Sequence, residues 1–156
     1  GLREQSGLIE QRVPMRAKDD PIARRLMSVP GVGPLITLAF MATIDDPKRF
    51  SSSADVGAYL GLTPRRWQSG AVNYQGHISR CGDAFLRGYL FEAATVLLLR
   101  SAKSSALKEW GLRIAERSSM RKAKVAVARK LAVILHKIWI TEGEFIAEAP
   151  TVSAAA

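Results

Sequence analysis

The sequence predicts a mostly α-helical, compact domain, and three observations support that class. The chain has 156 residues, of which 47% are hydrophobic, enough to bury one sizeable core. Apolar residues recur at helical spacing along most of the chain, with proline and glycine between the runs. A brief extended pattern occurs only at residues 71–74. We therefore expect helices around one core and leave open a small β-hairpin near residues 65–80.

The first two helices are expected on either side of a tight turn. Pro21 fits a first helical turn, and apolar residues then follow at helical spacing up to Pro30. A second apolar run occupies residues 35–44. This arrangement is typical of a helix-hairpin-helix element, here over about residues 22–44, in which backbone N–H groups at the start of the second helix can face a DNA phosphate. A turn that only joins two helices is the alternative. The expected nucleic-acid contacts are Gly31, Val32 and Gly33.

Four further helices are expected after this element. The serines at 51–53 can cap a helix over residues 54–60, which Gly61 can end. Asp83 can cap a helix that is apolar on most faces from residue 85 to residue 100, so we expect that helix to be buried at the centre. Two amphipathic helices should follow, over residues 106–116 and 122–140.

These expected helices define the domain boundaries. Residues 21–142 form the predicted domain. Residues 1–20 are mostly polar and are interpreted as the frayed end of a helix that enters the domain. Residues 143–156 lack periodicity and end in small residues, so they are expected to form a disordered tail.

The charge of the chain indicates a polyanionic partner. Twenty-three Lys and Arg residues face fourteen Asp and Glu residues, which gives a net charge of +9. The basic residues are dense between residues 113 and 137, where Glu116 is the single acid. A basic domain whose charge serves only solubility is the alternative. The phosphate contacts expected in this stretch are Arg121, Lys122 and Lys124.

The segment from residue 65 to residue 79 shows no helical periodicity and is expected to be a functional loop. Ser69 precedes a glycine there and could present an exposed hydroxyl as a nucleophile, with nearby arginines stabilising charge on an attacked phosphate. A turn or phosphate-contact role for Ser69 is the alternative on chemistry alone. We do not expect His77 to act as a base. Further nucleic-acid contacts are expected at Arg65, Arg66, Arg80 and Arg87.

Neither a metal site nor a cofactor site is expected in this chain. Two histidines and one cysteine cannot build an ordinary zinc site, and the acids are scattered or suited to helix ends. Cys81 has no partner for an internal disulfide, and neither a signal peptide nor a membrane-length apolar run is evident. A cytoplasmic location is therefore expected.

Several short motifs occur in a fixed order along the chain. They are VPGVGP at 29–34, RF at 49–50, YLGLTP at 59–64, SG at 69–70, GHISRCG at 76–82 and LR at 86–87. Over roughly residues 22–140, this series resembles the C-terminal transposase domain of the insertion-sequence transposases related to the Piv and MooV DNA invertases. Each motif is weak by itself, but the combination is specific.

The resemblance implies a two-part active site. In that family an N-terminal RuvC-like domain carries a DEDD set of acids that binds Mg²⁺, and the C-terminal domain supplies a serine, which matches Ser69. The serine is taken to form a covalent intermediate with a DNA phosphate. The resemblance also implies a structured guide RNA (the bridge RNA), homo-oligomers of the full-length protein and a place near the bacterial or archaeal nucleoid. Transposition is the reaction it implies, and DNA inversion, as in the invertases, is the alternative. Residues 1–20 would correspond to the end of the helical linker that joins the two domains in the family.

This chain contains neither the RuvC-like domain nor the DEDD set, so we expect it to be inactive alone. Two other classes of function remain open. A non-catalytic helix-hairpin-helix module would bind DNA in a salt-dependent way that is indifferent to Ser69. A protein-interaction or dimerisation domain would not bind nucleic acid at moderate salt.

Overall fold

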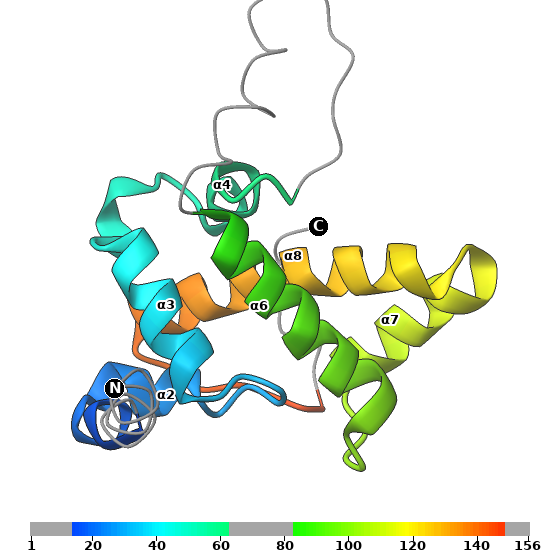
Figure 1. Ribbon diagram of the computed structural model, residues 1–156, viewed down its shortest axis with the longest axis horizontal. Helices are drawn as coiled ribbons and strands as arrows, with labels where there is room; N and C mark the ends of the chain where they lie inside the picture. Colours follow the sequence, from blue (N-terminus) through cyan, green and yellow to red (C-terminus); the bar gives the residue numbers. More distant parts are fainter. Residues whose placement is uncertain (1–13, 63–82, 149–156) are drawn as a thin grey trace, which may run out of the picture.

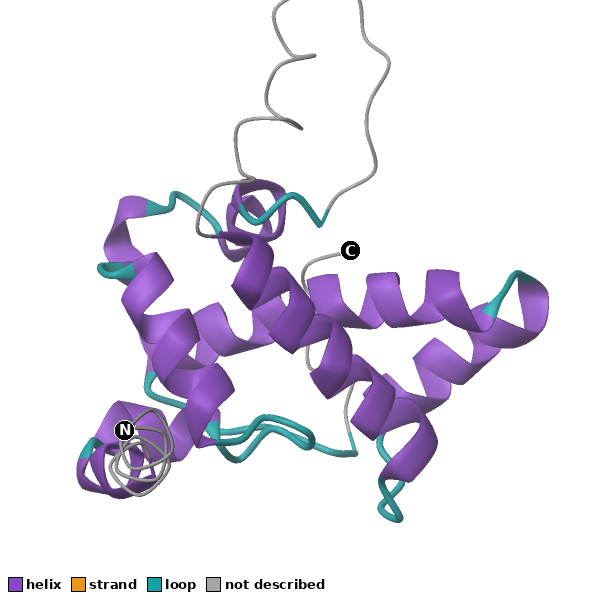
Figure 2. Cartoon of the chain, viewed as in Figure 1, coloured by secondary structure: helices purple, strands orange, loops and turns teal. Residues whose placement is uncertain are grey.

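The computed structural model describes residues 14–62 and 83–148, which are helical and contain no strand (Figures 1 and 2). Residues 14–19 are helical and lead into the domain. The elements after them are α2 (Pro21–Leu26), α3 (Pro34–Ile44), the 3-10 turn η1 (Pro47–Arg49), α4 (Ser53–Tyr59), α6 (Asp83–Thr95), the π-helical turn η3 (Val96–Arg100), α7 (Ala106–Arg117) and α8 (Met120–Thr141). The predicted helical class is confirmed, whereas the hairpin considered near residues 65–80 lies outside the described residues.

The helix ends follow the capping chemistry in the sequence. The Asp20 carboxylate accepts from the N–H groups of Ile22 at 2.8 Å and Ala23 at 3.2 Å, so α2 begins at Pro21. At the end of α4, Gly61 has a φ of 72°, and the Leu62 N–H reaches the Gly57 carbonyl at 2.9 Å. This Schellman arrangement ends the helix where the glycine predicted its end.

The central helix is α8, not α6 as we expected. Six consecutive residues of α8, from Leu131 to His136, are buried, because α2, α4, α6, α7 and η1 all pack around it. Figure 1 shows α8 crossing behind α6 through the middle of the fold. In contrast, α6 keeps an exposed side that includes Phe85, Gly88 and Glu92. The prediction relied on apolar content alone. Because α8 carries many basic residues, its sequence did not indicate that its second half is buried.

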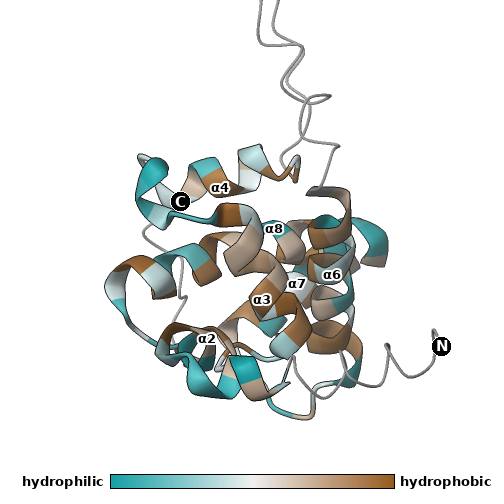
Figure 3. Ribbon diagram, turned by 60° about the vertical axis from the view of Figure 1, so that its left-hand side comes forward, coloured by the Kyte–Doolittle hydropathy of each residue, from teal (hydrophilic) through white to brown (hydrophobic). Residues whose placement is uncertain are grey.

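Residues of α3, α6 and α8 contribute to one hydrophobic core, and Figure 3 shows hydrophobic positions, in brown, along these three helices. Gly111 on α7 marks a tight crossing in this core. A Cβ at that position would lie 2.6 Å from a Leu98 methyl group and 2.7 Å from a Val127 methyl group. Without a side chain at residue 111, α7 packs directly on η3 and α8.

The chain after α8 does not match the expectation of a disordered tail beginning at residue 143. The Phe145 N–H donates to Ser28 Oγ at 3.0 Å, and the Ala147 carbonyl accepts from the Ala106 N–H at 2.8 Å. Residues 143–148 therefore lie along the domain, and the half-buried Phe145 packs against the core. Residues 149–156 lie outside the described residues. These contacts join residues far apart in sequence, so local composition could not reveal them.

Candidate nucleic-acid interface

The predicted nucleophile, Ser69, lies outside the described residues, as do Arg65, Arg66 and Arg80. The structure does describe the residues that flank this connecting segment (residues 63–82). Arg87, in the second turn of α6, donates from Nη1 to the Leu60 carbonyl at the end of α4, at 3.2 Å. This bond holds together the helices that precede and follow the connecting segment.

A second arginine, Arg49, contacts Tyr59, the last residue of α4. The Arg49 guanidinium carbon lies 5.1 Å from the ring centroids of both Phe50 and Tyr59. The two rings meet edge to face at 5.2 Å, and Arg49 Nη2 also donates to the Thr43 carbonyl at 3.4 Å. Stacking and a hydrogen bond thus hold an exposed cation in place at the end of α4.

Beneath these rings, His136 fixes the position of α4. It is buried, with its two ring nitrogens 2.8 Å from Ser53 Oγ and 2.8 Å from the Pro47 carbonyl oxygen. Because a carbonyl can only accept, Nε2 donates to Pro47, and a neutral ring then accepts from the Ser53 hydroxyl at Nδ1. The Phe50 ring packs edge to face on the imidazole at 5.8 Å. These contacts give His136 a structural role in the domain.

The three turn residues predicted to contact DNA occupy three different environments. Gly31 has a φ of 85°, and a Cβ there would lie 2.7 Å from the Ala93 carbonyl oxygen of α6. Val32 is buried in the core with 5% exposure. A Cβ on Gly33, the N-cap of α3, would meet nothing within 4 Å. At residue 31, the absence of a side chain lets the turn pack closely on the α6 backbone inside the domain. At residue 33, the space where a side chain would lie is open.

The turn lines a hollow of about 640 Å³. Its other walls are the Lys103–Ser105 stretch before α7 and, from the chain after α8, Phe145 and Ala147. Gly33 and Ser105 are the N-caps of α3 and α7, so two helix starts border this hollow. The Ser105 hydroxyl already accepts from the Lys108 N–H at 3.1 Å.

The predicted cations of α8 lie at its start. Arg121 and Lys122 are exposed, and the half-buried Lys124 holds its ammonium nitrogen 5.7 Å from the Phe91 ring centroid on α6. No acid occurs in the first turn of α8. Cations at a helix N-terminus oppose the helix dipole, so this end of α8 concentrates positive potential that an anion would relieve.

One flank of α6 carries two of the predicted cationic contacts. Arg87 and Phe91 are four residues apart, so they lie on the same side of the helix, about 6 Å apart along its axis. Lys124 rests on that same Phe91. The structure therefore brings Arg87 and Lys124 to one side of α6. Gly31 instead packs on Ala93, two residues beyond Phe91 and about 200° around the helix.

Farther along α8, Lys130 is half-buried with its ammonium nitrogen 5.1 Å from the Trp110 ring centroid. Burial lowers the pKa of Lys130, and the neighbouring charges of Arg129 and Lys137 lower it further. Three cations held close together on one helix raise the local positive potential.

The described residues contain no cluster of three or more His, Cys, Asp or Glu residues able to hold a metal ion. In the same part of the chain, no helix is both long enough and apolar enough to cross a membrane.

Comparison with known proteins gives the family. Residues 23–110, more than half of the 156, match the Transposase IS116/IS110/IS902 family. The chain belongs to this family. The matched range contains the α2–α3 turn, the connecting segment and Arg87, while the cations at the start of α8 lie beyond it.

Individual relatives agree with this membership. The chain is 37% identical over 135 residues to the transposase for insertion sequence element IS1328 of Yersinia enterocolitica, covering 85% of this chain and 40% of that protein. It is 35% identical over 134 residues to the transposase for insertion sequence element IS1111A of Coxiella burnetii, covering 85% and 36%. It is 28% identical over 118 residues to the pilin gene-inverting protein of Moraxella lacunata, covering 74% and 36%. The chain spans less than half the length of these relatives.

Sequence reasoning missed two features of this IS110-type domain. Arg49 entered only as part of a motif, although its neighbour Phe50 and the nearby Tyr59 were signals that a stacked cation could form. Ser28 was not singled out at all. Its contact with Phe145 joins positions 117 residues apart, which no local pattern predicts.

Proposed function

We propose that this chain is the DNA-binding and catalytic-serine domain of an insertion-sequence transposase or site-specific recombinase. The bond from Arg87 to the Leu60 carbonyl carries the structural argument. It fixes the two helices that flank the Ser69-bearing segment, and Arg49 adds a cation at the same place. A nucleophile for a phosphodiester must be held in position near positive charge, and the joined helix ends and the Arg49 cation support this proposal.

The proposed chemistry is strand cleavage and rejoining through Ser69. The hydroxyl loses its proton, its oxygen forms a bond to the phosphorus of a DNA phosphodiester, and the bond from phosphorus to one sugar oxygen breaks. That sugar oxygen takes up a proton and leaves as a hydroxyl. Attack by a DNA hydroxyl on the serine phosphodiester reverses these steps and reseals a strand without an external energy source.

Binding in this proposal uses two surfaces. The cationic flank of α6, with Arg87 and Lys124, and the exposed Arg121 and Lys122 would neutralise phosphates. Gly33, with open space around it at the start of α3, would let a phosphate approach backbone N–H groups, as in a helix-hairpin-helix element. These contacts carry no base readout, so sequence choice would come from elsewhere.

The remaining partners also belong to the proposal. A RuvC-like domain of the parent protein would supply the acids and Mg²⁺, a structured guide RNA would select the DNA sites, and the full-length protein would act as a homo-oligomer. Relatives named both as transposases and as a gene-inverting protein leave both outcomes of strand exchange open.

The test uses the full-length parent protein with Ser69→Ala and, as a matched control from the same segment, Ser79→Ala. We expect Ser69→Ala to abolish both recombination and the covalent protein–DNA adduct, which is detected as a protease-sensitive shift of labelled DNA on a denaturing gel. Ser79→Ala should retain both. Loss of activity only in the Ser79 variant would move the nucleophile to residue 79. Full activity in both variants would show that neither serine is the nucleophile, and a wild-type protein that binds DNA but forms no adduct would favour a module without chemistry.

A further inference from the structure

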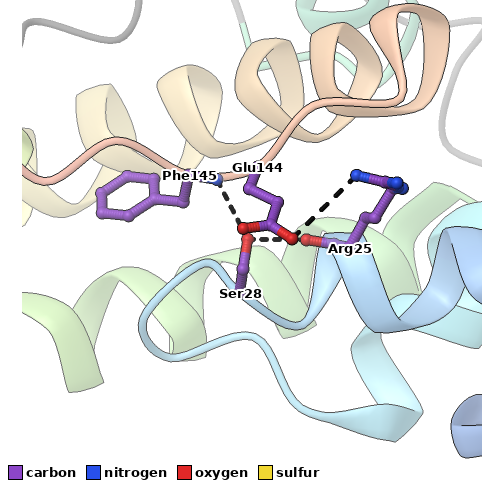
Figure 4. A network of polar contacts seen from close by, with 4 residues as sticks. All are labelled: Arg25, Ser28, Glu144 and Phe145. Atoms are coloured by element: carbon purple, nitrogen blue, oxygen red, sulfur yellow. Dashed lines mark hydrogen bonds and ion pairs between the residues drawn. The ribbon is translucent and has the colours of Figure 1, made fainter.

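The chain after α8 lies against the α2–α3 turn. In Figure 4, the Phe145 N–H points to Ser28 Oγ, and the Ser28 hydroxyl in turn donates to the Arg25 carbonyl at 2.7 Å. Beyond Phe145, the Ala147 carbonyl binds the Ala106 N–H at the start of α7. Residues 142–148, which we call the acidic strap, therefore run from the end of α8 past the turn to α7.

The strap is acidic in a strongly basic chain. It carries Glu142, Glu144 and Glu148, and no Lys or Arg follows residue 142, whereas the whole chain has a net charge of +9. Glu144 Oε1 lies 4.0 Å from Arg25 Nη1, so a carboxylate is placed at a cation next to the turn (Figure 4). A phosphate brought to the turn would present the same charge to the same arginine.

The strap and the turn also share a space. Phe145 and Ala147 form one wall of the hollow, Gly33 and the rest of the turn form another, and Lys103 adds a cation. A phosphate that reaches the start of α3 through this hollow passes the strap. The ion pair is weak because its side chains are 40% and 70% exposed, so a polyanion can compete with it.

We propose that the acidic strap is an internal competitor of nucleic acid at the α2–α3 turn. In the free protein, the Glu144 carboxylate pairs with the Arg25 guanidinium. A nucleic-acid backbone that binds the turn displaces the strap. This competition lowers the affinity of the turn for isolated phosphates, because a single phosphate cannot replace all the strap contacts. A continuous nucleic-acid backbone can replace more of them and is therefore bound in preference. It rests on the proposed nucleic-acid binding of this domain.

The first measurement compares matched charge removals in the 156-residue chain. Fluorescence anisotropy with a labelled 30-base-pair duplex at low salt gives the affinity of Glu144→Gln and of Asp45→Asn. Each variant loses one exposed carboxylate, but Asp45 lies at the far end of α3 from the turn. We expect Glu144→Gln to bind more tightly than Asp45→Asn, by roughly two- to fivefold, the range that an exposed ion pair supplies. Ser28→Ala, which removes the acceptor of the Phe145 N–H, should shift affinity the same way.

The second measurement reports the strap directly. Hydrogen exchange at the Phe145 and Ala106 amides, both bonded across the strap contacts, should become faster when the duplex is added. Slower or unchanged exchange, together with equal affinities for the Glu144 and Asp45 variants, would show that the strap does not compete with DNA. DNA binding by the domain would still stand. No binding of the duplex by any variant at low salt would reject the binding function itself, and the strap with it.

Discussion

The two flanks of α6 differ in how their residues hold the domain together. On the flank of Ala93, Gly31 fits only because it has no side chain, and Val32 is buried beside it. On the flank of Phe91, Lys124 rests on a ring and can still reach solvent. A residue of the first kind is coupled to folding, while one of the second kind can be changed with little loss of stability. Residues that were all predicted to contact DNA therefore have two roles: Gly31 and Val32 stabilise the fold, and Lys124 is available to bind a phosphate.

The largest effect is expected for Gly31→Ala. The φ of 85° and the 2.7 Å approach of a Cβ to the Ala93 carbonyl oxygen both oppose an alanine there. We expect a loss of about 2–4 kcal/mol in the free energy of unfolding, combining backbone strain with overpacking. Urea denaturation followed by circular dichroism measures it.

Gly88→Ala is the matched control on the exposed side of α6. A Cβ there meets nothing within 4 Å, so alanine should leave stability unchanged or raise it by about 0.5–1 kcal/mol through helix propensity. Equal stability of the Gly31 and Gly88 variants would show that the turn does not pack on α6 as described.

Arg87→Met should have the next largest effect. It keeps the length of the side chain but removes the donor to the Leu60 carbonyl, which joins α4 to α6. We expect a loss of about 1 kcal/mol in the free energy of unfolding. In the full-length protein, recombination should fall further than this loss of stability explains, because the bond joins the helices that precede and follow the proposed nucleophile Ser69 in the sequence. Recombination that falls only in proportion to the folded fraction would limit Arg87 to a structural role.

Local chemistry predicted more of this fold than long-range chemistry did. Pro21 begins α2 and Gly61 ends α4 through contacts within a few residues, so the sequence predicted both helix ends. The packing of Gly31 on Ala93 and the contact of Phe145 with Ser28 join distant segments, and only the folded chain brings them together. The same limit applies to the site. The sequence nominated Arg87 and Lys124 separately, but not their shared flank of α6.

Lys124→Gln should affect binding more than folding. The change removes one cation and a stacking contact with Phe91, with an expected stability loss of about 0.5–1 kcal/mol. If Lys124 neutralises one phosphate, the slope of log affinity against log salt concentration should become shallower by about 0.9. Anisotropy titrations of the duplex across a salt series measure that slope. The exposed Lys18, outside both flanks, provides a control as Lys18→Gln. The same slope for both variants would indicate that the cationic flank is not a specific contact surface.

The smallest effect on folding is expected at Gly33, only two residues from the position with the largest. Its φ of −96° suits any residue and a Cβ meets nothing within 4 Å, so Gly33→Ala should lower the free energy of unfolding by only about 0.5 kcal/mol, because alanine is a weaker N-cap than glycine. Gly33→Glu should be tolerated equally well, yet it places a carboxylate at the start of α3, where a phosphate would bind. If the duplex contacts the turn, the glutamate variant should bind several-fold more weakly than the alanine variant at low salt. Equal affinities would mean that DNA does not approach α3 here, and that both glycines of the turn serve the fold alone.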